Sequence, residues 1–455
     1  MKDVKWWRGA AALLLVLTMV AGACSSRDDD ETSSGGGDDS SSDEGGSSGD
    51  SDSEQVDYAN PEDCTSYDGT QGVSDAEILI GNSLPQSGLY SVFDQVRIGI
   101  QGYFNYKNAN GGIEGRDLVL KSLDDAYLPE RTRQNVETLV GTEGVFAMVG
   151  NVGTENNQQA QQYLEEQGLC VPNLAVSTGY PGFGDPEQDP WIINGLPNYA
   201  LESIAFADYL KANSPSAKVA ILSQNDSFGE AYVTAFESAI EGTDITVVAK
   251  ETFDPKTETN PQGQVTTLSG SGADALLLGV TSLPCPNALK SVKDSGWAPL
   301  TYVTLTCSSK VLMDVAADAA EGTISTRATY DPADPASQTE TAVVDFKEQG
   351  AAAGLSPEDL EELNVAAGWN AGAYLAQLLE ASPELDRAAV MNTAWYQKDV
   401  TFGLFLDGLT WNTDGQNDPF GITQLQFVKR TGGQWVPEGE LVDYTDQLRE
   451  VMGNK

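Results

Sequence analysis

The amino-acid sequence predicts an α/β protein with two doubly wound parallel-sheet lobes. From about residue 75 onward, apolar runs of strand length alternate with helix-like segments, and the alternation restarts after residues 191–199. Each half is therefore a βαβαβ series, which is typical of a largely parallel sheet with helices on both faces. The length of 455 residues points the same way, because a chain this long normally divides into two domains.

The first half contains four apolar runs that are predicted strands: residues 77–82, 116–123, 145–150 and 169–176. The segment after the first strand has Val96, Ile100 and Phe104 on one face, which predicts an amphipathic helix. Pro129 opens a second helix, and a Gln-rich third helix follows the turn GNVGTEN at 150–156. A strand, a glycine turn and a helix N-terminus in that order build a corner that can bind a carboxylate or another anion.

The second half repeats the pattern, with predicted strands at residues 218–224, 244–253, 274–280 and 300–306. Helices are predicted between these strands at residues 228–240, 263–272 and 287–296. Parallel sheets bind ligands at the carboxyl ends of their strands. The turns that follow the strands are therefore expected to face a cleft between the lobes.

The first 24 residues have the pattern of a bacterial export signal. Lys2, Lys5 and Arg8 precede an apolar stretch at 9–20, which is too short to span a bilayer of about 30 Å. The stretch ends in VAGAC, which resembles a lipobox, so residues 1–23 are a predicted signal peptide and Cys24 is a predicted lipidation site. We expect an exported protein anchored by lipid alone to the outer face of the cell membrane. An ordinary secretory signal with an incidental cysteine is the alternative.

Residues 24–73 are predicted to be the lipidated cysteine followed by a disordered acidic tether. The segment from 25 to 63 is rich in Asp, Glu, Ser and Gly and almost free of apolar residues. Such a segment cannot bury enough surface to offset the entropy lost on ordering.

The composition argues against catalysis and against nucleic-acid binding. The chain has 68 acidic and 25 basic residues, a formal net charge of −43, so its surface repels phosphates. It has no histidine, which removes Ser–His–Asp and Cys–His catalysis and the commonest transition-metal ligand. We therefore expect a binding protein rather than an enzyme, with no metal ion and no cofactor.

Four cysteines remain after Cys24, and sequence alone does not choose among their three pairings. We favour Cys285–Cys307, because each residue follows a strand-like run and both should lie at one sheet edge. Cys64–Cys170 is then left by elimination. Four free thiols are the alternative.

The order of several motifs resembles the periplasmic type I solute-binding proteins. It is similar to the branch that contains the leucine/isoleucine/valine-binding proteins of ABC importers. The motifs that carry the resemblance are IGNSLPQSG (80–88), NGGIEGRDL (110–118), GNVGTENNQQA (150–160), SQNDSFGEAY (223–232) and LDGLTWNTDG (406–415). The resemblance implies two α/β lobes that are joined by three crossovers and close on a small solute by a hinge motion.

The resemblance also implies lobe boundaries. Lobe 1 is expected at residues 75–196 with 325–408, and lobe 2 at 197–324 with 409–455. The crossovers are expected near 194–198, 325–330 and 408–413.

The resemblance implies a ligand site at the strand ends. Thr154, with Asn151 and Gly153 beside it, corresponds to the position that binds the ligand's carboxylate, and Ser177 and Thr178 follow the next strand. Aromatic rings at Tyr90, Phe93 and Phe228 are expected to close over the ligand. Thr281 and Ser282, which follow the strand at 274–280, complete the candidate set.

One departure from the family bears on the ligand. Amino-acid-binding members hold the ammonium group with a carboxylate from the second lobe, and the matching segment LTCSSK (305–310) has no acid. Burying an unpaired ammonium costs several kcal/mol. Either Asp226 or Asp125 replaces the missing acid, or the ligand is an amide, carboxylate or polyol without an α-amine. Trp369 and Trp411 are interpreted as core or hinge packing, and the alternative is that either one borders the cleft.

The function expected from these features is capture of a small polar metabolite, an amino acid or a related amide or carboxylate, and its delivery to an ABC permease. The protein is expected to act as a monomer. A sensor of the same fold, coupled to a membrane regulator, is the first alternative. An exported enzyme with paired carboxylates is the second, and no sugar-cleft pattern of aromatic and acidic residues supports it.

Overall fold

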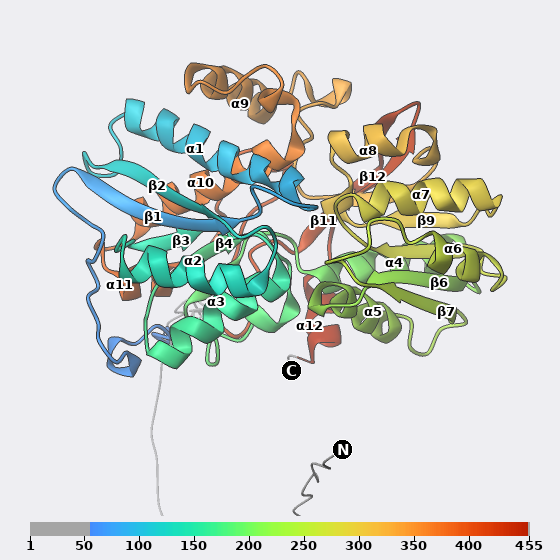
Figure 1. Cartoon of the computed structure of the whole chain (residues 1–455), viewed down its shortest axis with the longest axis horizontal. Helices are drawn as coiled ribbons and strands as arrows, with labels where there is room; N and C mark the ends of the chain where they lie inside the picture. Colours follow the sequence, from blue (N-terminus) through green and yellow to red (C-terminus); the bar gives the residue numbers. More distant parts are fainter. Residues whose placement is uncertain (1–54, 454–455) are drawn as a thin grey trace, which may run out of the picture. The chain divides into compact units, whose positions relative to one another are not determined.

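Two β-sheets organise residues 55–453, the part of the chain that the computed structural model describes (Figure 1). The predicted signal peptide and Cys24 lie outside these residues. Each sheet forms the centre of one lobe, with helices on its faces, as the sequence predicts. Among the described helices, none has the length and apolar character needed to cross a membrane.

The sheet of lobe 1 is fully parallel, with the strand order β2-β1-β3-β4-β5. Its strands are β1 (Glu77–Leu84), β2 (Asp117–Asp124), β3 (Ala147–Val149), β4 (Asn173–Val176) and β5 (Ile192–Asn194). Its helices are α1 (Asp94–Ala109), α2 (Pro129–Gly141), α3 (Thr154–Gln167), α9 (Thr341–Ala352), α10 (Leu363–Ala381) and α11 (Arg387–Ala394). The predicted apolar face of α1 is confirmed, because Val96, Ile100 and Phe104 are all buried.

Helices α1 and α10 approach each other closely through a reciprocal pair of glycines. A Cβ atom on Gly99 would lie 2.0 Å from the Val365 carbonyl oxygen, and one on Gly368 would lie 2.0 Å from the Val96 carbonyl oxygen. Each helix therefore needs a glycine where the other's backbone passes. This contact fixes α10, which supplies part of the ligand cavity, against the first helix of the lobe.

The sheet of lobe 2 has seven strands in the order β12-β11-β10-β9-β8-β6-β7. Its strands are β6 (Lys218–Gln224), β7 (Thr246–Phe253), β8 (Ala275–Gly279), β9 (Leu300–Val303), β10 (Ile324–Arg327), β11 (Gln424–Thr431) and β12 (Gln434–Asp443). Its helices are α4 (Tyr199–Asn213), α5 (Ser227–Ala239), α6 (Gln262–Ser269), α7 (Pro284–Ser295), α8 (Lys310–Ala316) and α12 (Thr445–Met452). Strands β6 to β10 are parallel, whereas β11 and β12 add an antiparallel hairpin at the edge that the sequence did not predict.

The chain passes between the lobes three times, after β5, after β10 and before β11. The second and third passages lie side by side, because the Leu406 N–H donates to the Ala328 carbonyl oxygen over 3.1 Å. Two boundaries differ from the expected ones. Residues 325–327 belong to the lobe 2 sheet through β10, and the Thr413 hydroxyl donates to the Ala394 carbonyl oxygen of lobe 1 over 2.8 Å. The chain therefore still contacts lobe 1 at Thr413, the end of the segment that was expected to form the third crossover.

The folded body begins earlier than the predicted tether boundary at residue 73. Ala59 is buried, and its N–H donates to Asn392 Oδ1 over 2.9 Å. The Tyr58 ring packs against Trp395 and Tyr396, with centroid distances of 6.3 and 6.1 Å. Because Tyr58 and Ala59 pack against lobe 1, the segment from 55 to 73 belongs to the folded body rather than to the tether.

Both expected disulfides are present. Cys64 bonds to Cys170, which ties the segment from 55 to 73 to lobe 1, and Cys285 bonds to Cys307 in lobe 2. The second bond joins the chain just after β8 to the chain just after β9, which are neighbouring parallel strands. The expectation that both cysteines lie at one sheet edge is confirmed.

Candidate functional site

A cavity of about 140 Å³ lies between the lobes. Its lining comes from both sheets and from all three crossovers, at the carboxyl ends of the strands, where parallel sheets bind ligands. Five of the ten predicted ligand-binding residues line this cavity: Phe93, Gly153, Ser177, Phe228 and Thr281. The other five lie next to it and contact its walls or the lobe interface.

The corner between β3 and α3 forms one wall. Gly153 precedes α3 with φ of 104°, a conformation that favours glycine, and a Cβ atom there would lie 2.7 Å from Asn156 Oδ1. Because Gly153 has no side chain, its backbone atoms themselves line the cavity. Asn151 has a supporting role, because its Oδ1 accepts from the Ser83 N–H over 2.7 Å and its Nδ2 donates to Asn173 Oδ1 over 3.0 Å.

The Thr154 hydroxyl is buried and lies 2.9 Å from the Thr178 hydroxyl. Both neighbour the phenol of Tyr199, which lines the cavity. Burial raises the pKa of Tyr199 to about 12, and the two hydroxyls partly counteract that rise. The three side chains form a neutral cluster of hydroxyl groups at the cavity wall.

Aromatic rings from both lobes lie in and beside the cavity wall. Tyr90 stacks on Tyr127, a lining residue, with the ring centroids 3.9 Å apart. Phe228 from lobe 2 meets Tyr199 edge to face at 4.9 Å. Tyr127 and Tyr199 were not among the predicted residues, although each is an aromatic residue next to a predicted turn.

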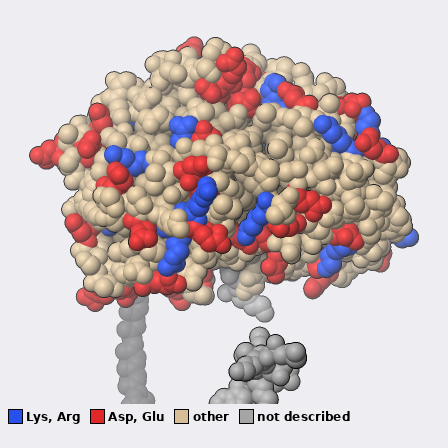
Figure 2. Space-filling model, viewed as in Figure 1, with Lys and Arg blue, Asp and Glu red and all other residues tan. Residues whose placement is uncertain are grey.

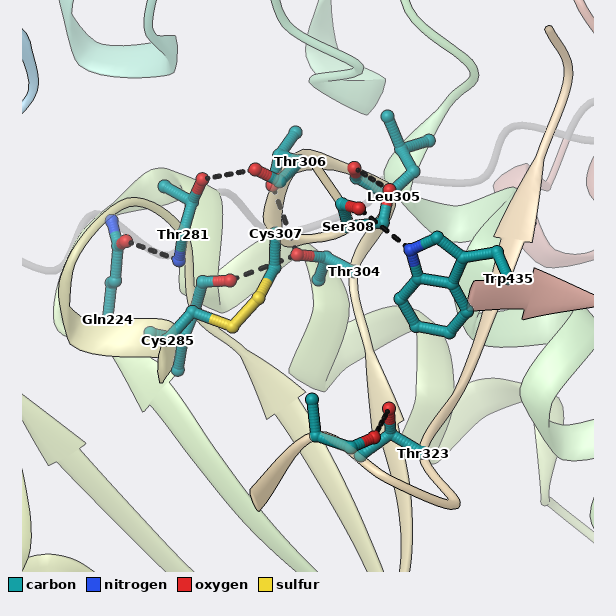
Figure 3. Close-up of a disulfide and its surroundings, with 12 residues drawn as sticks. Gln224, Thr281, Cys285, Thr304, Leu305, Thr306, Cys307, Ser308, Thr323 and Trp435 are labelled. Atoms are coloured by element: carbon teal, nitrogen blue, oxygen red, sulfur yellow. Dashed lines mark hydrogen bonds between the residues drawn. A yellow bond between two sulfur atoms is a disulfide. The ribbon is translucent and has the colours of Figure 1, made fainter. Parts of the chain in front are cut away.

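Lobe 2 contributes the loop that its disulfide holds (Figure 3). The Thr281 N–H donates to Gln224 Oε1 over 3.2 Å, and its hydroxyl donates to the Thr306 carbonyl oxygen over 3.1 Å. Trp435 Nε1–H donates to the Ser308 carbonyl oxygen over 2.8 Å. Leu305, Thr306 and Ser308 line the cavity, so the segment without an acid faces the ligand space.

Neither acid proposed as a substitute lines the cavity. Asp125 accepts from the hydroxyls of Ser83 and Thr132 over 2.9 and 3.0 Å, and from the Tyr127 N–H over 2.8 Å. Asp226 accepts from the Gly229 N–H at the start of α5 over 2.9 Å. Both carboxylates accept hydrogen bonds from groups of the protein, and neither lines the cavity. The geometry therefore does not support the expectation that one of them pairs with a ligand ammonium group.

Glu202 is a third acid close to the cavity, and it is fully buried. It accepts from the hydroxyls of Tyr232 and Tyr302, and from the Leu305 N–H over 2.8 Å. Burial raises the pKa of Glu202 to about 7, although these hydrogen bonds favour its charged form. Its oxygens position Leu305, which does line the cavity.

Two charged residues that the sequence did not single out line the cavity beside β10. Arg327 donates through Nε and Nη2 to Gln426 Oε1 over 3.0 and 2.9 Å, and burial lowers its pKa. Asp331 accepts from the Ala333 N–H over 2.9 Å, and burial raises its pKa to about 6. Asp331 is the one acid among the described lining residues. The residues around both positions, EGTISTRATYD (321–331), are mostly polar and gave no sequence signal for a site.

The end of the cavity at the crossovers is aromatic. Tyr374, Phe402, Phe405 and Trp411 line it. Trp411 therefore borders the ligand space, as one of the two interpretations held. Trp369 lies outside this lining, in a cluster with Tyr103 and Phe346.

The lobes touch across the mouth of the cavity. The Ser282 hydroxyl donates to the Leu89 carbonyl oxygen, and the Ser227 hydroxyl donates to Gln158 Oε1, each over 3.1 Å. Lys256 and Glu155 form an ion pair of 3.3 Å between the lobes. The structure is therefore a closed form.

The chain folds into two α/β lobes that enclose a cavity between their sheets. Residues 77–431 match the family of periplasmic binding proteins, and the chain belongs to this family. The family acts outside the cytoplasm, and the relatives of this chain are binding proteins.

Among individual proteins, the chain is 26% identical over 264 residues to Leu/Ile/Val-binding protein homolog 3 of Brucella melitensis biotype 1. That match covers 58% of this chain and 70% of the relative. A branched chain amino acid ABC transporter protein from Thermus thermophilus with bound valine has the same fold, with a TM-score of 0.72 and 18% identity over 83% of this chain and 99% of the other.

An R. palustris solute-binding protein in complex with 4-hydroxybenzoate is similar in the same way. Its TM-score is 0.67 and its identity 17%, over 81% of this chain and 97% of the other. The fold is thus shared with proteins crystallised with ligands of different chemistry.

Proposed function

We propose that the protein is the lipid-anchored solute receptor of an ABC importer, and that it captures a small carboxylate in the interlobe cavity. The observation that carries the proposal is the closed cavity itself, which is lined by both lobes and by every crossover. A ligand held there contacts both lobes, so its binding energy favours the closed form that a permease can distinguish from the open one.

The carboxylate end of the ligand is assigned to the β3–α3 corner. The start of α3, a helix of 14 residues, presents unpaired N–H groups next to Gly153, and such a terminus favours negative charge. Ser177 from the neighbouring strand end and Thr281 from lobe 2 add hydroxyl groups to the lining. Thr154 supports this corner through its contact with Thr178.

The lining favours a solute whose remaining body is apolar. Valine and 4-hydroxybenzoate, which the similar structures contain, are both small carboxylates with an apolar body. In this chain, Asp331 already accepts one backbone hydrogen bond, and Arg327 lies beside it in the lining. A carboxylate that accepts one hydrogen bond can accept others, so Asp331 can also pair with an α-ammonium group, and solutes with and without an α-amine both have to be compared.

The family supports the proposal of delivery to a permease, and the export signal supports the proposal of attachment through Cys24. The charge pattern fits a soluble body, because Lys and Arg side chains are scattered among Asp and Glu on the face in Figure 2 rather than gathered into a basic patch. We infer that the protein works as a monomer with one solute per cavity.

The test is a binding panel that uses matched pairs of solutes with and without an α-amine. Leucine is compared with 4-methylpentanoate, and phenylalanine with 3-phenylpropionate, by thermal shift and then by calorimetry on the purified protein. Ligand at 100 times its Kd stabilises the folded form by about 2.7 kcal/mol. Absence of binding by every carboxylate in the panel would refute the assigned ligand class.

A further inference from the structure

A second pocket lies in lobe 1, among α1, α9, α10 and the segment that precedes the third crossover. Its volume is about 310 Å³, which is within the range of small-molecule sites. Figure 1 shows α9 on the outer side of α1, at the edge of the molecule. Among the described residues, Phe402 alone lines both this outer pocket and the interlobe cavity. The outer pocket is therefore separate from the site between the lobes.

Each of the three helices turns one face toward the outer pocket. On α1, Tyr103 and Tyr106 are three residues apart, and on α9 and α10 the lining positions recur every three or four residues. Positions with this spacing lie on the same side of a helix, so three regular helix faces form the walls. The lining on α9 is Ala342, Asp345, Phe346 and Gln349, and the lining on α10 is Trp369, Ala373, Gln377 and Glu380.

Three aromatic side chains stand together in the wall of the outer pocket. Tyr103 meets Trp369 edge to face, with the ring centroids 5.1 Å apart. Tyr106 lies 5.7 Å from Trp369 and 5.9 Å from Tyr103, and its ring is inclined to theirs by 36° and 62°. Both tyrosines are only partly buried, so they keep surface that a ligand can contact. Grouped rings of this kind attract quaternary ammonium ions through the negative faces of the rings.

The ionisable groups of the outer pocket are acidic. Asp345 and Glu380 line it, and no Lys or Arg is among its described lining residues. Glu380 pairs with Lys107 over 2.6 Å, whereas Asp345 is exposed and has no ion-pair partner within the described part of the chain. Burial raises the pKa of Tyr103 to about 12, and the neighbouring Tyr106 and Glu380 add to the rise. A cation in this pocket therefore meets an unpaired carboxylate as well as aromatic rings.

We propose that the outer pocket is a second ligand site and that it binds a small quaternary ammonium ion. The methyl groups of such an ion contact the rings, and Asp345 balances its charge. The formal net charge of −43 attracts cations to the protein and so supports a ligand of this sign. The two acids disfavour an ion that also carries a phosphate group, so a free ammonium ion fits better than the phosphocholine group of a lipid. This site does not depend on which solute the interlobe cavity binds.

The test is an NMR titration of choline with the purified protein at low ionic strength. Two further probes are titrated in parallel. 3,3-Dimethyl-1-butanol has the shape of choline without its charge, and phosphocholine carries the same ammonium group next to a phosphate. We expect choline to bind about tenfold more tightly than either of them, because only choline presents a net positive charge to the rings and to Asp345.

Two substitutions locate the bound ion. Tyr106→Leu removes a ring and should weaken choline binding by about twofold to tenfold, whereas Tyr106→Phe keeps the ring and should weaken it by less than twofold. Asp345→Asn removes the unpaired charge and should weaken choline binding by about twofold to fivefold. Glu348→Gln changes an exposed acid of α9 outside the lining, so it is the control for Asp345→Asn and should have no effect.

Three outcomes overturn the proposal, and none of them bears on the proposed function, which is tested with carboxylates. Equal binding of choline and the neutral alcohol would mean that the pocket does not recognise charge. Loss of choline binding in Asp331→Asn but not in Asp345→Asn would place the ion in the interlobe cavity. Absence of choline binding at low salt would exclude this class of ligand. If Tyr106→Leu does not fold, the comparison of Asp345→Asn with Glu348→Gln decides, because both positions are exposed.

Discussion

Glu202 makes the stability of the protein depend on pH in a direction that is unusual for an acid in a hydrogen-bonded site. Burial raises the pKa of this carboxyl from 4.5 to about 7, and the residue is completely enclosed by Tyr232, Tyr302 and the Leu305 N–H. An acid whose pKa is higher in the folded state binds its proton more tightly there. Its contribution to stability is therefore fully present below pH 4.5 and is lost as the pH rises through 7.

The magnitude follows from the two pKa values. A rise from 4.5 to about 7, at 1.36 kcal/mol per pH unit, corresponds to about 3 kcal/mol of folding free energy between pH 4.5 and pH 8. Glu202→Gln imitates the protonated acid at every pH. Its amide can donate to the Tyr232 hydroxyl, while its carbonyl oxygen still accepts from Tyr302 and the Leu305 N–H.

The assay is urea unfolding of the unaltered protein and of Glu202→Gln at pH 5 and pH 8. We expect the variant to gain up to about 3 kcal/mol relative to the unaltered protein when the pH is raised from 5 to 8. Glu241→Gln, at an exposed position, is the control and should show no such gain. An equal difference between Glu202→Gln and the unaltered protein at both pH values would refute the reasoning.

Three further predictions concern the corner, the disulfide and the anchor. Thr154→Ala removes the hydroxyl that lies 2.9 Å from Thr178 and should weaken carboxylate binding by about 1–2 kcal/mol in calorimetry, whereas unchanged affinity would remove Thr154 from the site. Replacing Cys64 and Cys170 together by Ser opens a loop of 106 residues and should lower the unfolding free energy by about 4–5 kcal/mol in urea, and a loss below 1 kcal/mol would contradict the loop-entropy account. Cys24→Ala should move the exported protein from the membrane fraction to the soluble fraction of a host that acylates lipoproteins, and continued membrane association would contradict lipidation.

The sequence predicted the part of the fold in which each strand is one continuous apolar run. Strands such as β6 and β8 are buried on both faces of the sheet, and a strand of this kind appears in the sequence as an uninterrupted apolar run. It did not predict α10, which is buried on nearly all sides. A helix of this kind lacks the polar face that makes an amphipathic helix recognisable from the spacing of its apolar residues. The hairpin of β11 and β12 was also missed, because β12 is mostly exposed and its apolar residues do not alternate with polar ones.

The predicted site residues follow strands, whereas lining residues such as Tyr374 on α10 and Asp331 after β10 were not predicted. Gly153 and Ser177 follow β3 and β4, so their turns could be located from the strands. Tyr374, Trp411 and Asp331 come from segments whose contact depends on how the second and third crossovers pass each other. Only the folded chain brings these segments together, and a single sequence contains no local signal for that arrangement.

The segment from 55 to 73 attaches the N-terminal part of the chain to lobe 1 and not to lobe 2. It is bonded to lobe 1 through Cys64–Cys170 and packed there through Tyr58, whereas the chain reaches lobe 2 only through the crossovers. A pull on the chain at residue 55 therefore acts first on lobe 1. If the protein is tethered at its N-terminus, lobe 1 keeps a constant attachment to the membrane and lobe 2 performs the swing that opens and closes the cavity.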